Sequence, residues 1–159
     1  MTTLTVAEGL LRAGFDCAVG VPDSHLTALL EQLHRPSLPV YCPPREDCAV
    51  AVAVGLTLAG ARPLVFMKNA GLFTTGDALT SLARDAAVPL ALLVGWAGTG
   101  SDRLPHHVVT GERTTALLDG LAISWTTPAD TADLAGWFAG HRAAGHHSAL
   151  LIEPQEAHR

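Results

Sequence analysis

Short runs of β-favouring residues alternate with helix-favouring stretches along this chain, and this alternation constrains the fold more than any other feature. The expected strands are residues 17–21, 40–42, 64–67, 90–94, 123–126 and 149–152. The expected helices are residues 5–13, 23–34, 46–59, 77–84, 108–118 and 129–144. Two of the runs, from Pro63 to Met67 and from Pro89 to Val94, are apolar throughout, as in strands that helices cover on both faces. The pattern therefore predicts an α/β fold of three layers, with a doubly wound, six-stranded parallel sheet between helices.

The size and composition of the chain favour one globular domain. The chain has 159 residues, the size of one ordinary domain, and we expect residues 1–159 to form it. Hydrophobic residues make up 48% of the sequence, so we expect surplus apolar surface to face a partner chain. A net charge of -5 argues against binding to nucleic acid, and no apolar run reaches the roughly 20 residues that span a bilayer. Because the first residues lack the basic stretch of a signal peptide, the expected location is the cytoplasm.

The cysteines and one pair of histidines suggest no special chemistry. Cys17, Cys42 and Cys48 show no disulfide spacing, so we expect them to be small, buried apolar side chains. His146 and His147 stand just before the last expected strand, where a surface turn is the plain interpretation.

In open parallel sheets, ligands bind beyond the carboxyl ends of the strands, so the strand-to-helix turns are the informative positions. After the first expected strand, Asp23 and Ser24 can cap the next helix or contact a ligand. After the second, Glu46 opens the most apolar helix of the chain, where it can complement the helix dipole or share a proton with a ligand. After the third, Lys68 and Asn69 can orient an anion or belong to a solvated loop.

The longest turn runs from Gly95 to His107, is rich in glycine, and contains Arg103 and His106. It matches neither G-x-x-x-x-G-K-[ST] nor G-x-G-x-x-G, the two nucleotide-binding loops. The two histidines have no cysteine or carboxylate at zinc-ligand spacing, so no metal site is expected in this chain. A G-x-S-x-G nucleophile turn does not occur either. From the residues alone, the prediction is an α/β domain with an anion-binding edge.

Four segments, taken in their order along the chain, resemble a known family. They are Gly20-Val-Pro-Asp-Ser24; Arg45-Glu-Asp-Cys-Ala-Val-Ala-Val-Ala-Val-Gly55; Met67-Lys-Asn-Ala-Gly-Leu72 with Leu79-Thr-Ser-Leu82; and Gly95-Trp-Ala-Gly98 with Pro105-His-His107 and Gly111. Together they cover most of the chain, from about Cys17 to Pro154, and resemble the pyrimidine-binding domain of the thiamine diphosphate-dependent phosphonopyruvate and sulfopyruvate decarboxylases. The fold that this resemblance implies is the same three-layer α/β domain.

The resemblance also implies roles for residues in the turns. Glu46 matches the catalytic glutamate that hydrogen-bonds N1′ of the cofactor's aminopyrimidine and favours its imino tautomer, which can take up the thiazolium C2 proton. The residues expected to bind the cofactor are Glu46, Pro22, Asp23, Asn69 and Gly71. The residues expected to bind the substrate are Asp23, Ser24, Lys68, Asn69, Arg103, His106 and His107. Of the two histidines, His107 matches the histidine of the family's Pro-x-His element.

The chain departs from the family pattern at three places, all on the expected substrate side. Residues 68–71 are Lys-Asn-Ala-Gly where Gln-Asn-Ser-Gly is common, and residues 77–78 are Asp-Ala where Asn-Pro is common. Residues 103–104 are Arg-Leu where the family tends to be acidic. The first and third changes, together with His106, add positive charge that suits a phosphonate or sulfonate tail.

The resemblance finally implies a partner. The family binds magnesium and the diphosphate on a second domain, through a Gly-Asp-Gly segment followed by an asparagine, and no Gly-Asp-Gly occurs here. We therefore expect a hetero-oligomer in which this chain is the α subunit. Thiamine diphosphate would lie between it and a β subunit that carries the Gly-Asp-Gly…Asn motif and most contacts to Mg²⁺. The expected substrate is a small anionic 2-oxo acid, 3-phosphonopyruvate, converted to phosphonoacetaldehyde and CO₂; the alternatives are 3-sulfopyruvate decarboxylation, carboligation, and a scaffold or regulatory subunit without catalysis.

Overall fold

A computed structural model describes residues 3–154; residues 1–2 and 155–159 of the expected domain lie outside the described part. Six parallel strands form one sheet in the order β2-β1-β3-β4-β6-β5. The strands are β1 (Cys17–Gly20), β2 (Val40–Tyr41), β3 (Pro63–Lys68), β4 (Ala91–Gly95), β5 (Ser124–Thr126) and β6 (Ser148–Ile152). The helices are α1 (Thr3–Arg12), α2 (Thr27–Leu33), α3 (Glu46–Leu58), α4 (Asn69–Leu72), the π-helix η1 (Ala78–Ala83), α5 (Pro105–Gly120) and α6 (Leu134–Ala143). Within residues 3–154, no helix combines the length and the hydropathy needed to cross a membrane.

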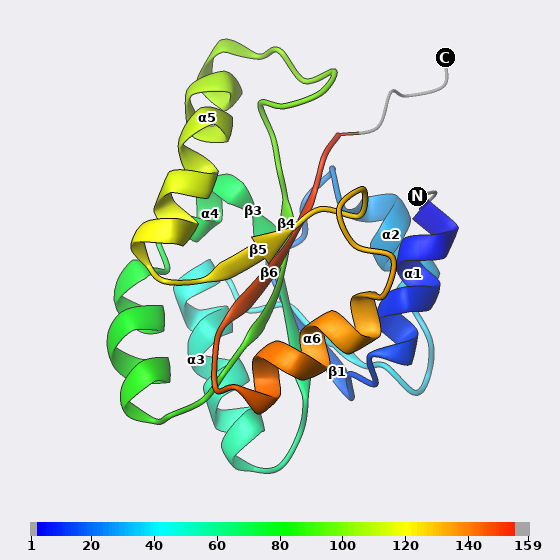
Figure 1. Cartoon of the computed structure of the whole chain (residues 1–159), viewed down its shortest axis with the longest axis vertical. Helices are drawn as coiled ribbons and strands as arrows, with labels where there is room; N and C mark the ends of the chain where they lie inside the picture. Colours follow the sequence, from blue (N-terminus) through cyan, green and yellow to red (C-terminus); the bar gives the residue numbers. More distant parts are fainter. Residues whose placement is uncertain (1–2, 155–159) are drawn as a thin grey trace.

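Helices cover both faces of the sheet, which confirms the predicted α/β fold with three layers. Helices α3, α4 and α5 lie on one side of the strands, and α1, α2 and α6 lie on the other (Figure 1). Strand β3 shows how the core is divided: Val65 and Met67 pack on the α3 side, whereas Leu64 and Phe66 pack on the α1 side. Burial on both faces is the reason why this strand is apolar almost throughout.

The direction in which the sheet grows reverses at β1. Strand β1 pairs with β2 on one side and with β3 on the other, and β3 pairs in turn with β4. A reversal of this kind opens a crevice beyond the carboxyl ends of the strands. The register pairs Gly20 with Phe66 and Lys68 with Gly95, so the turns after β1, β3 and β4 leave the same edge of the sheet side by side.

Several element boundaries differ from the predicted ones, and three of these differences are the most informative. Residues 69–72, expected in a turn, form the single turn of α4 directly after β3. Helix α5 begins at Pro105, a residue suited to the first position of a helix, so His106 and His107 lie in the first helical turn and not in a loop. The last helix begins at Leu134 and not near residue 129, because the Asp133 carboxylate caps it by accepting the N–H of Gly136 at 3.0 Å.

Two predictions about side-chain burial are wrong. Only Cys17 is buried; Cys42 and Cys48 are exposed, because Cys42 follows the edge strand β2 and Cys48 lies on the outer side of α3. His147 is half-buried instead of lying in an open surface turn, and its Nδ1 accepts the N–H of Leu90 at 3.1 Å. The neighbouring His146 is exposed, as expected for a turn.

Candidate functional site

Glu46 is the first residue of α3, and its side chain lies against Gly71 in α4. A β-carbon at position 71 would collide with Cγ, Cδ and Oε1 of Glu46, so only glycine leaves room for the carboxylate there. Glu46 is half-buried, and no hydrogen bond or ion pair within residues 3–154 engages its carboxylate. The carboxylate can therefore accept a hydrogen bond from a bound molecule without giving up a bond inside the chain.

A second group of polar side chains lies at the carboxyl ends of β1, β3 and β4. The Oδ2 atom of Asp102 lies 2.7 Å from Nδ1 of His107 and 3.2 Å from Nε2 of His25. The Nδ1 atom of His25 lies 3.2 Å from Oδ1 of Asp23. The Nζ atom of Lys68 donates to Nε2 of His107 at 2.8 Å. We call this continuous row of five side chains the polar network.

Two glycines, one at the end of β4 and one in the turn after it, make room for the polar network. A β-carbon on Gly95 would collide with Oδ2 of Asp23, and one on Gly98 would collide with the backbone carbonyl of His107. Gly98 also adopts a φ of +84°, which favours glycine, and its N–H donates to Oδ2 of Asp102 at 3.1 Å. The glycine-rich turn thus serves as the surface on which Asp23 and the start of α5 pack.

The Asp102 carboxylate is ionised at neutral pH. Burial acts to raise its pKa, but the N–H groups of Gly98 and Leu104 and the ring of His107 outweigh that effect and lower the pKa to about 2. The side chain of Asp102 is only 9% exposed. A fixed negative charge therefore stands between the two histidine rings.

Asn69 is fully buried and holds α4 in place. Its Nδ2 donates to the carbonyl of Ala97 at 2.9 Å and to Oγ1 of Thr114 at 3.0 Å. Its Oδ1 is buried and has no partner among the described residues. These contacts tie the β3–α4 junction to α5, and a direct contact of Asn69 with a ligand stays a prediction.

The structure brings some of the predicted residues together and leaves others apart. Glu46 meets Gly71, while Asp23, Lys68 and His107 meet in the polar network. The remaining predicted residues are exposed near the same edge of the sheet: Pro22, Ser24, Arg103 and His106. The ring of His106 lies 4.3 Å from that of His107, centroid to centroid.

Two members of the polar network, His25 and Asp102, were missed from the sequence. Asp102 stands five residues before His107, and the zinc-ligand spacings considered for this histidine did not single out that carboxylate. The turn folds back and clamps Asp102 between the N–H groups of Gly98 and Leu104, which brings it to the ring. His25 carries no comparable sequence signal, since only the folded sheet brings the turn after β1 to the turn after β4.

A metal ion is one conceivable occupant of this network. One nitrogen of His25, one nitrogen of His107 and one oxygen of Asp102 all lie within 4.8 Å of one another, a spacing that can hold a metal ion. In this arrangement the same atoms are already joined by hydrogen bonds, which a metal would have to replace.

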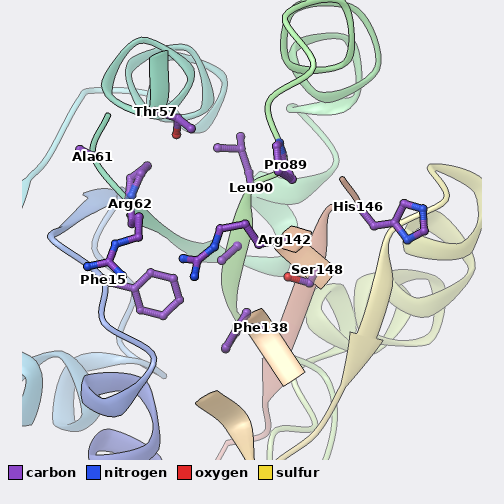
Figure 2. A pocket seen from close by; sticks show the side chains of 12 residues that line it. Phe15, Thr57, Ala61, Arg62, Pro89, Leu90, Phe138, Arg142, His146 and Ser148 are labelled. Atoms are coloured by element: carbon purple, nitrogen blue, oxygen red, sulfur yellow. The ribbon is translucent and has the colours of Figure 1, made fainter. Parts of the chain in front are cut away.

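A pocket at the opposite end of the sheet has no part in this site. Figure 2 shows its lining, with Phe15 and Phe138 near the guanidinium groups of Arg62 and Arg142. It lies at the amino ends of the strands, beside residues such as Ser148 at the start of β6. It encloses about 40 Å³, room for about three water molecules, and is too small for an organic ligand.

Comparison with known proteins assigns the chain to a family. Residues 2–123 match the family described as "Thiamine pyrophosphate enzyme, N-terminal TPP binding domain". The chain is 34% identical over 148 residues to the phosphonopyruvate decarboxylase of Streptomyces viridochromogenes, covering 91% of this chain and 37% of that protein. It is 31% identical over 129 residues to the sulfopyruvate decarboxylase subunit alpha of Methanothermobacter thermautotrophicus, covering 80% of this chain and 78% of that subunit. The chain thus spans little more than a third of the length of the first relative.

Solved structures share the same fold. The thiamine diphosphate-dependent 4-hydroxybenzoylformate decarboxylase of Rhodococcus jostii RHA1 superposes with a TM-score of 0.69 at 16% identity, over 97% of this chain and 30% of that chain. The 2-oxoglutarate:ferredoxin oxidoreductase of Magnetococcus marinus superposes with a TM-score of 0.71 at 16% identity, over 96% of this chain and 28% of that chain. With the match over residues 2–123, the chain belongs to the family of N-terminal thiamine diphosphate-binding domains of thiamine diphosphate enzymes.

Proposed function

We propose that this chain is the pyrimidine-binding subunit of a thiamine diphosphate-dependent decarboxylase of small anionic 2-oxo acids. The leading substrate is 3-phosphonopyruvate, which would yield phosphonoacetaldehyde and CO₂, and the second candidate is 3-sulfopyruvate. The single observation that supports the catalytic role most directly is the Glu46 carboxylate, which lies over Gly71 without a hydrogen-bond partner in residues 3–154. Relatives named phosphonopyruvate decarboxylase and sulfopyruvate decarboxylase support the reaction class and both substrates.

The residues at the head of α3 fit an aminopyrimidine ring. A protonated ring nitrogen needs an acceptor, and the Glu46 carboxylate is one that the other described residues do not use. The bare backbone at Gly71 keeps a side chain from filling the space beside that carboxylate. When bound, thiamine diphosphate supplies the electron sink that decarboxylation of a 2-oxo acid requires. The role of Glu46 would be to share a proton with N1′ of the aminopyrimidine ring.

Positive charge near the polar network suits an anionic substrate. Lys68 is held at the end of β3 by His107, Arg103 is exposed just before α5, and His106 is exposed in the first turn of that helix. A guanidinium and an ammonium both bind phosphonate or sulfonate oxygens through charge-assisted hydrogen bonds. We therefore propose that these three residues face the acidic tail of the substrate.

We further propose a β subunit as the partner of this chain. One side of α3 exposes Cys48, Ala51, Val52, Gly55 and Leu58, a set that we call the outer face of α3. These positions recur every three to four residues, so they form one apolar stripe, and Val52 and Leu58 are 41% and 66% exposed. Glu46 stands at the head of the same helix, so a subunit on this face would border the carboxylate. The partner would carry the Gly-Asp-Gly…Asn motif and most contacts to Mg²⁺.

The decisive experiment is Glu46→Gln in the complex of this chain with a candidate β subunit that carries Gly-Asp-Gly…Asn. The amide cannot accept and return the proton, so we expect turnover to fall about 100-fold or more while the complex still assembles. Glu31→Gln, which alters an exposed glutamate on α2, is the matched control and should leave turnover unchanged. Unchanged turnover in Glu46→Gln would replace the catalytic role by that of a scaffold or regulatory subunit.

The need for a partner is tested separately by calorimetry. Thiamine diphosphate and Mg²⁺ are titrated into this chain alone and into the complex. We expect weak binding to the chain alone and tight, magnesium-dependent binding to the complex. Tight, magnesium-dependent binding by the chain alone would contradict the two-subunit site.

A further inference from the structure

The contacts of His107 determine which of its ring nitrogens carries the proton. The ammonium of Lys68 has only donors to offer, so Nε2 of His107, 2.8 Å away, must be the acceptor. The other nitrogen, Nδ1, faces the ionised carboxylate of Asp102 at 2.7 Å, and this contact needs a donor. Both contacts are satisfied together by one form only, the neutral ring protonated on Nδ1.

His25 links this histidine to a second carboxylate. Its Nε2 lies 3.2 Å from Asp102 and its Nδ1 lies 3.2 Å from Asp23, so a ring that donates at both ends satisfies both acids. The side chain of Asp23 is only 5% exposed, and its second oxygen, Oδ2, is buried and has no partner among the described residues. This oxygen packs against Gly95, where a β-carbon would collide with it, and it is a buried acceptor that the described residues leave unused.

We propose that Asp102 and His25 are positioning residues of the active site: Asp102 holds His107 in the Nδ1–H tautomer so that Nε2 anchors the Lys68 ammonium, and His25 joins this pair to Asp23. The anchored ammonium then stands at a fixed place at the edge of the sheet, ready for the acidic tail of the substrate. This use of the network rests on the proposed function, whereas the tautomer is a property of the chain itself.

The groups that face His107 come from four segments of the chain. Lys68 approaches from β3, Asp102 from the turn after β4, and His106 from the same turn of α5. His25 reaches from the turn after β1, with its ring centroid 6.0 Å from that of His107. The polar network and the adjacent His106 together hold two acids, one ammonium and three imidazole rings, and of these rings that of His106 is exposed.

Hydrogen bonds account for these contacts better than a bound metal ion does. A metal on Nδ1 of His107 would leave the ring proton to reside on Nε2, where it would face the ammonium of Lys68. The cation would also add its charge close to that ammonium. Protons on Nδ1 of His107 and on His25 satisfy the same carboxylates without this conflict.

The test is a direct measurement of the ring protons in the full chain labelled with ¹⁵N. Long-range ¹H–¹⁵N correlation spectra distinguish a protonated from an unprotonated ring nitrogen for each histidine. At pH 7 we expect His107 to show a protonated Nδ1 and an unprotonated Nε2. A proton on Nε2 of His107 in the wild-type chain overturns the proposal, and this arm needs no variant that might fail to fold.

Asp102→Asn tests the cause of the tautomer. Without the carboxylate, we expect a large part of His107 to move to the Nε2–H form and the signals of His25 to shift as well. Asp16→Asn is the matched control, because the Asp16 carboxylate also accepts from a basic side chain, that of Arg62, but lies outside the network. An unchanged tautomer in Asp102→Asn would show that Asp102 only organises its own turn.

Zn²⁺ is the probe for the competing metal site. One equivalent added to the wild-type chain should leave the His25 and His107 signals in place at micromolar concentration. Binding of Zn²⁺ that removes the Nδ1 proton of His107 at that concentration would overturn the hydrogen-bonded network in favour of a metal site.

A kinetic arm separates failure of this proposal from failure of the proposed function. In the active complex, Asp102→Asn should raise KM for the 2-oxo acid about tenfold, with a smaller change in kcat, because the ammonium is no longer anchored. An unchanged KM would overturn the use of the network in substrate binding. If the wild-type complex shows no decarboxylation, the proposed function fails, while the spectra still decide the tautomer.

Discussion

The Nζ atom of Lys68, the last residue of β3, lies 2.8 Å from Nε2 of His107 in the first turn of α5. This contact joins two segments that lie 39 residues apart in the sequence. It also restrains a long side chain that would otherwise sample many rotamers, so less entropy is lost when an anion binds to it. Lys68 and the exposed Arg103 therefore differ in how well each is prepared to bind the proposed anionic substrate.

Removing either cation should weaken substrate binding in the active complex. We expect Lys68→Ala to raise KM by more than about tenfold, which corresponds to about 1.4 kcal/mol, and Arg103→Ala to raise it less. Arg113→Ala, at an exposed position further along α5, serves as the control in the same steady-state assay. If both variants keep the wild-type KM, neither residue binds the acidic tail.

Gly71→Ala should displace the Glu46 carboxylate. The added β-carbon would collide with three atoms of that side chain, so we expect a loss of about 1–3 kcal/mol in the free energy of unfolding. Binding of thiamine diphosphate to the complex should weaken at least tenfold, as measured by calorimetry. Gly140→Ala on α6 is the matched control, because an added β-carbon there meets no atom within 4 Å. It should leave the cofactor affinity unchanged and either keep the free energy of unfolding or raise it by up to about 1 kcal/mol. If Gly71→Ala binds thiamine diphosphate as tightly as the wild type does, Gly71 is not part of the cofactor site.

Acid should destabilise the fold through Asp102. Its pKa is about 2 in the folded chain against an ordinary value of 3.8, so the unfolded chain takes up the proton first and stability falls as the pH drops from about 4 to 2. We expect a loss on the order of 1 kcal/mol that is absent in Asp102→Asn, as measured by urea unfolding at each pH. Asp47, paired with Arg45, has a similar pKa, but it lies on the surface. When the urea unfolding at each pH is repeated in 1 M salt, the contribution of Asp47 to the loss of stability should disappear, whereas that of Asp102 should remain.

His147 should make the fold sensitive to mild acid. Burial lowers its pKa below the ordinary 6.5, so just below pH 6.5 the unfolded chain binds a proton that the folded chain does not. Stability therefore falls with decreasing pH, with a slope of up to about 1.4 kcal/mol per pH unit, until the folded pKa is reached. His147→Asn should flatten this slope in thermal or urea unfolding, whereas His146→Asn, at an exposed position, should not. Equal slopes in the two variants would show that another group is responsible.

A charge on the outer face of α3 should block assembly without unfolding the chain. Val52 is 41% exposed, so Val52→Asp should change the free energy of unfolding by no more than about 0.5 kcal/mol. If the β subunit covers this face, the buried charge should weaken the complex by more than about tenfold in sedimentation velocity experiments. Ala139→Asp, on α6 at the other face of the sheet, is the matched control. Equal affinities for the two variants would place the partner elsewhere.

The sheet could be predicted because burial leaves a plain pattern in the sequence. Strands β3 and β4 are covered on both sides and therefore read as continuous apolar runs. The burial of the cysteines could not be predicted, since α3 is apolar on every side and its pattern does not tell the buried face from the exposed one. Cys48 was expected inside the protein as a small apolar side chain, and the pattern of α3 contains nothing that marks its position as exposed.

The candidate site was predictable only in part. The residues directly after the strands, such as Glu46 and Lys68, could be named because parallel strands end at one edge of the sheet. Asp102 and His25 could not, because their contacts depend on how a glycine-rich turn folds back onto the turn after β1. A contact across 77 positions of the chain leaves no mark in local spacing.

The single turn of α4 supports both halves of the site at once. Lys68 immediately precedes it and holds His107, while Gly71 within it underlies Glu46. Asn69 fastens the same turn to α5 from inside the fold. A small shift of this one helical turn would move an ammonium and release a carboxylate in the same motion, so the two halves of the candidate site are mechanically linked through four consecutive residues.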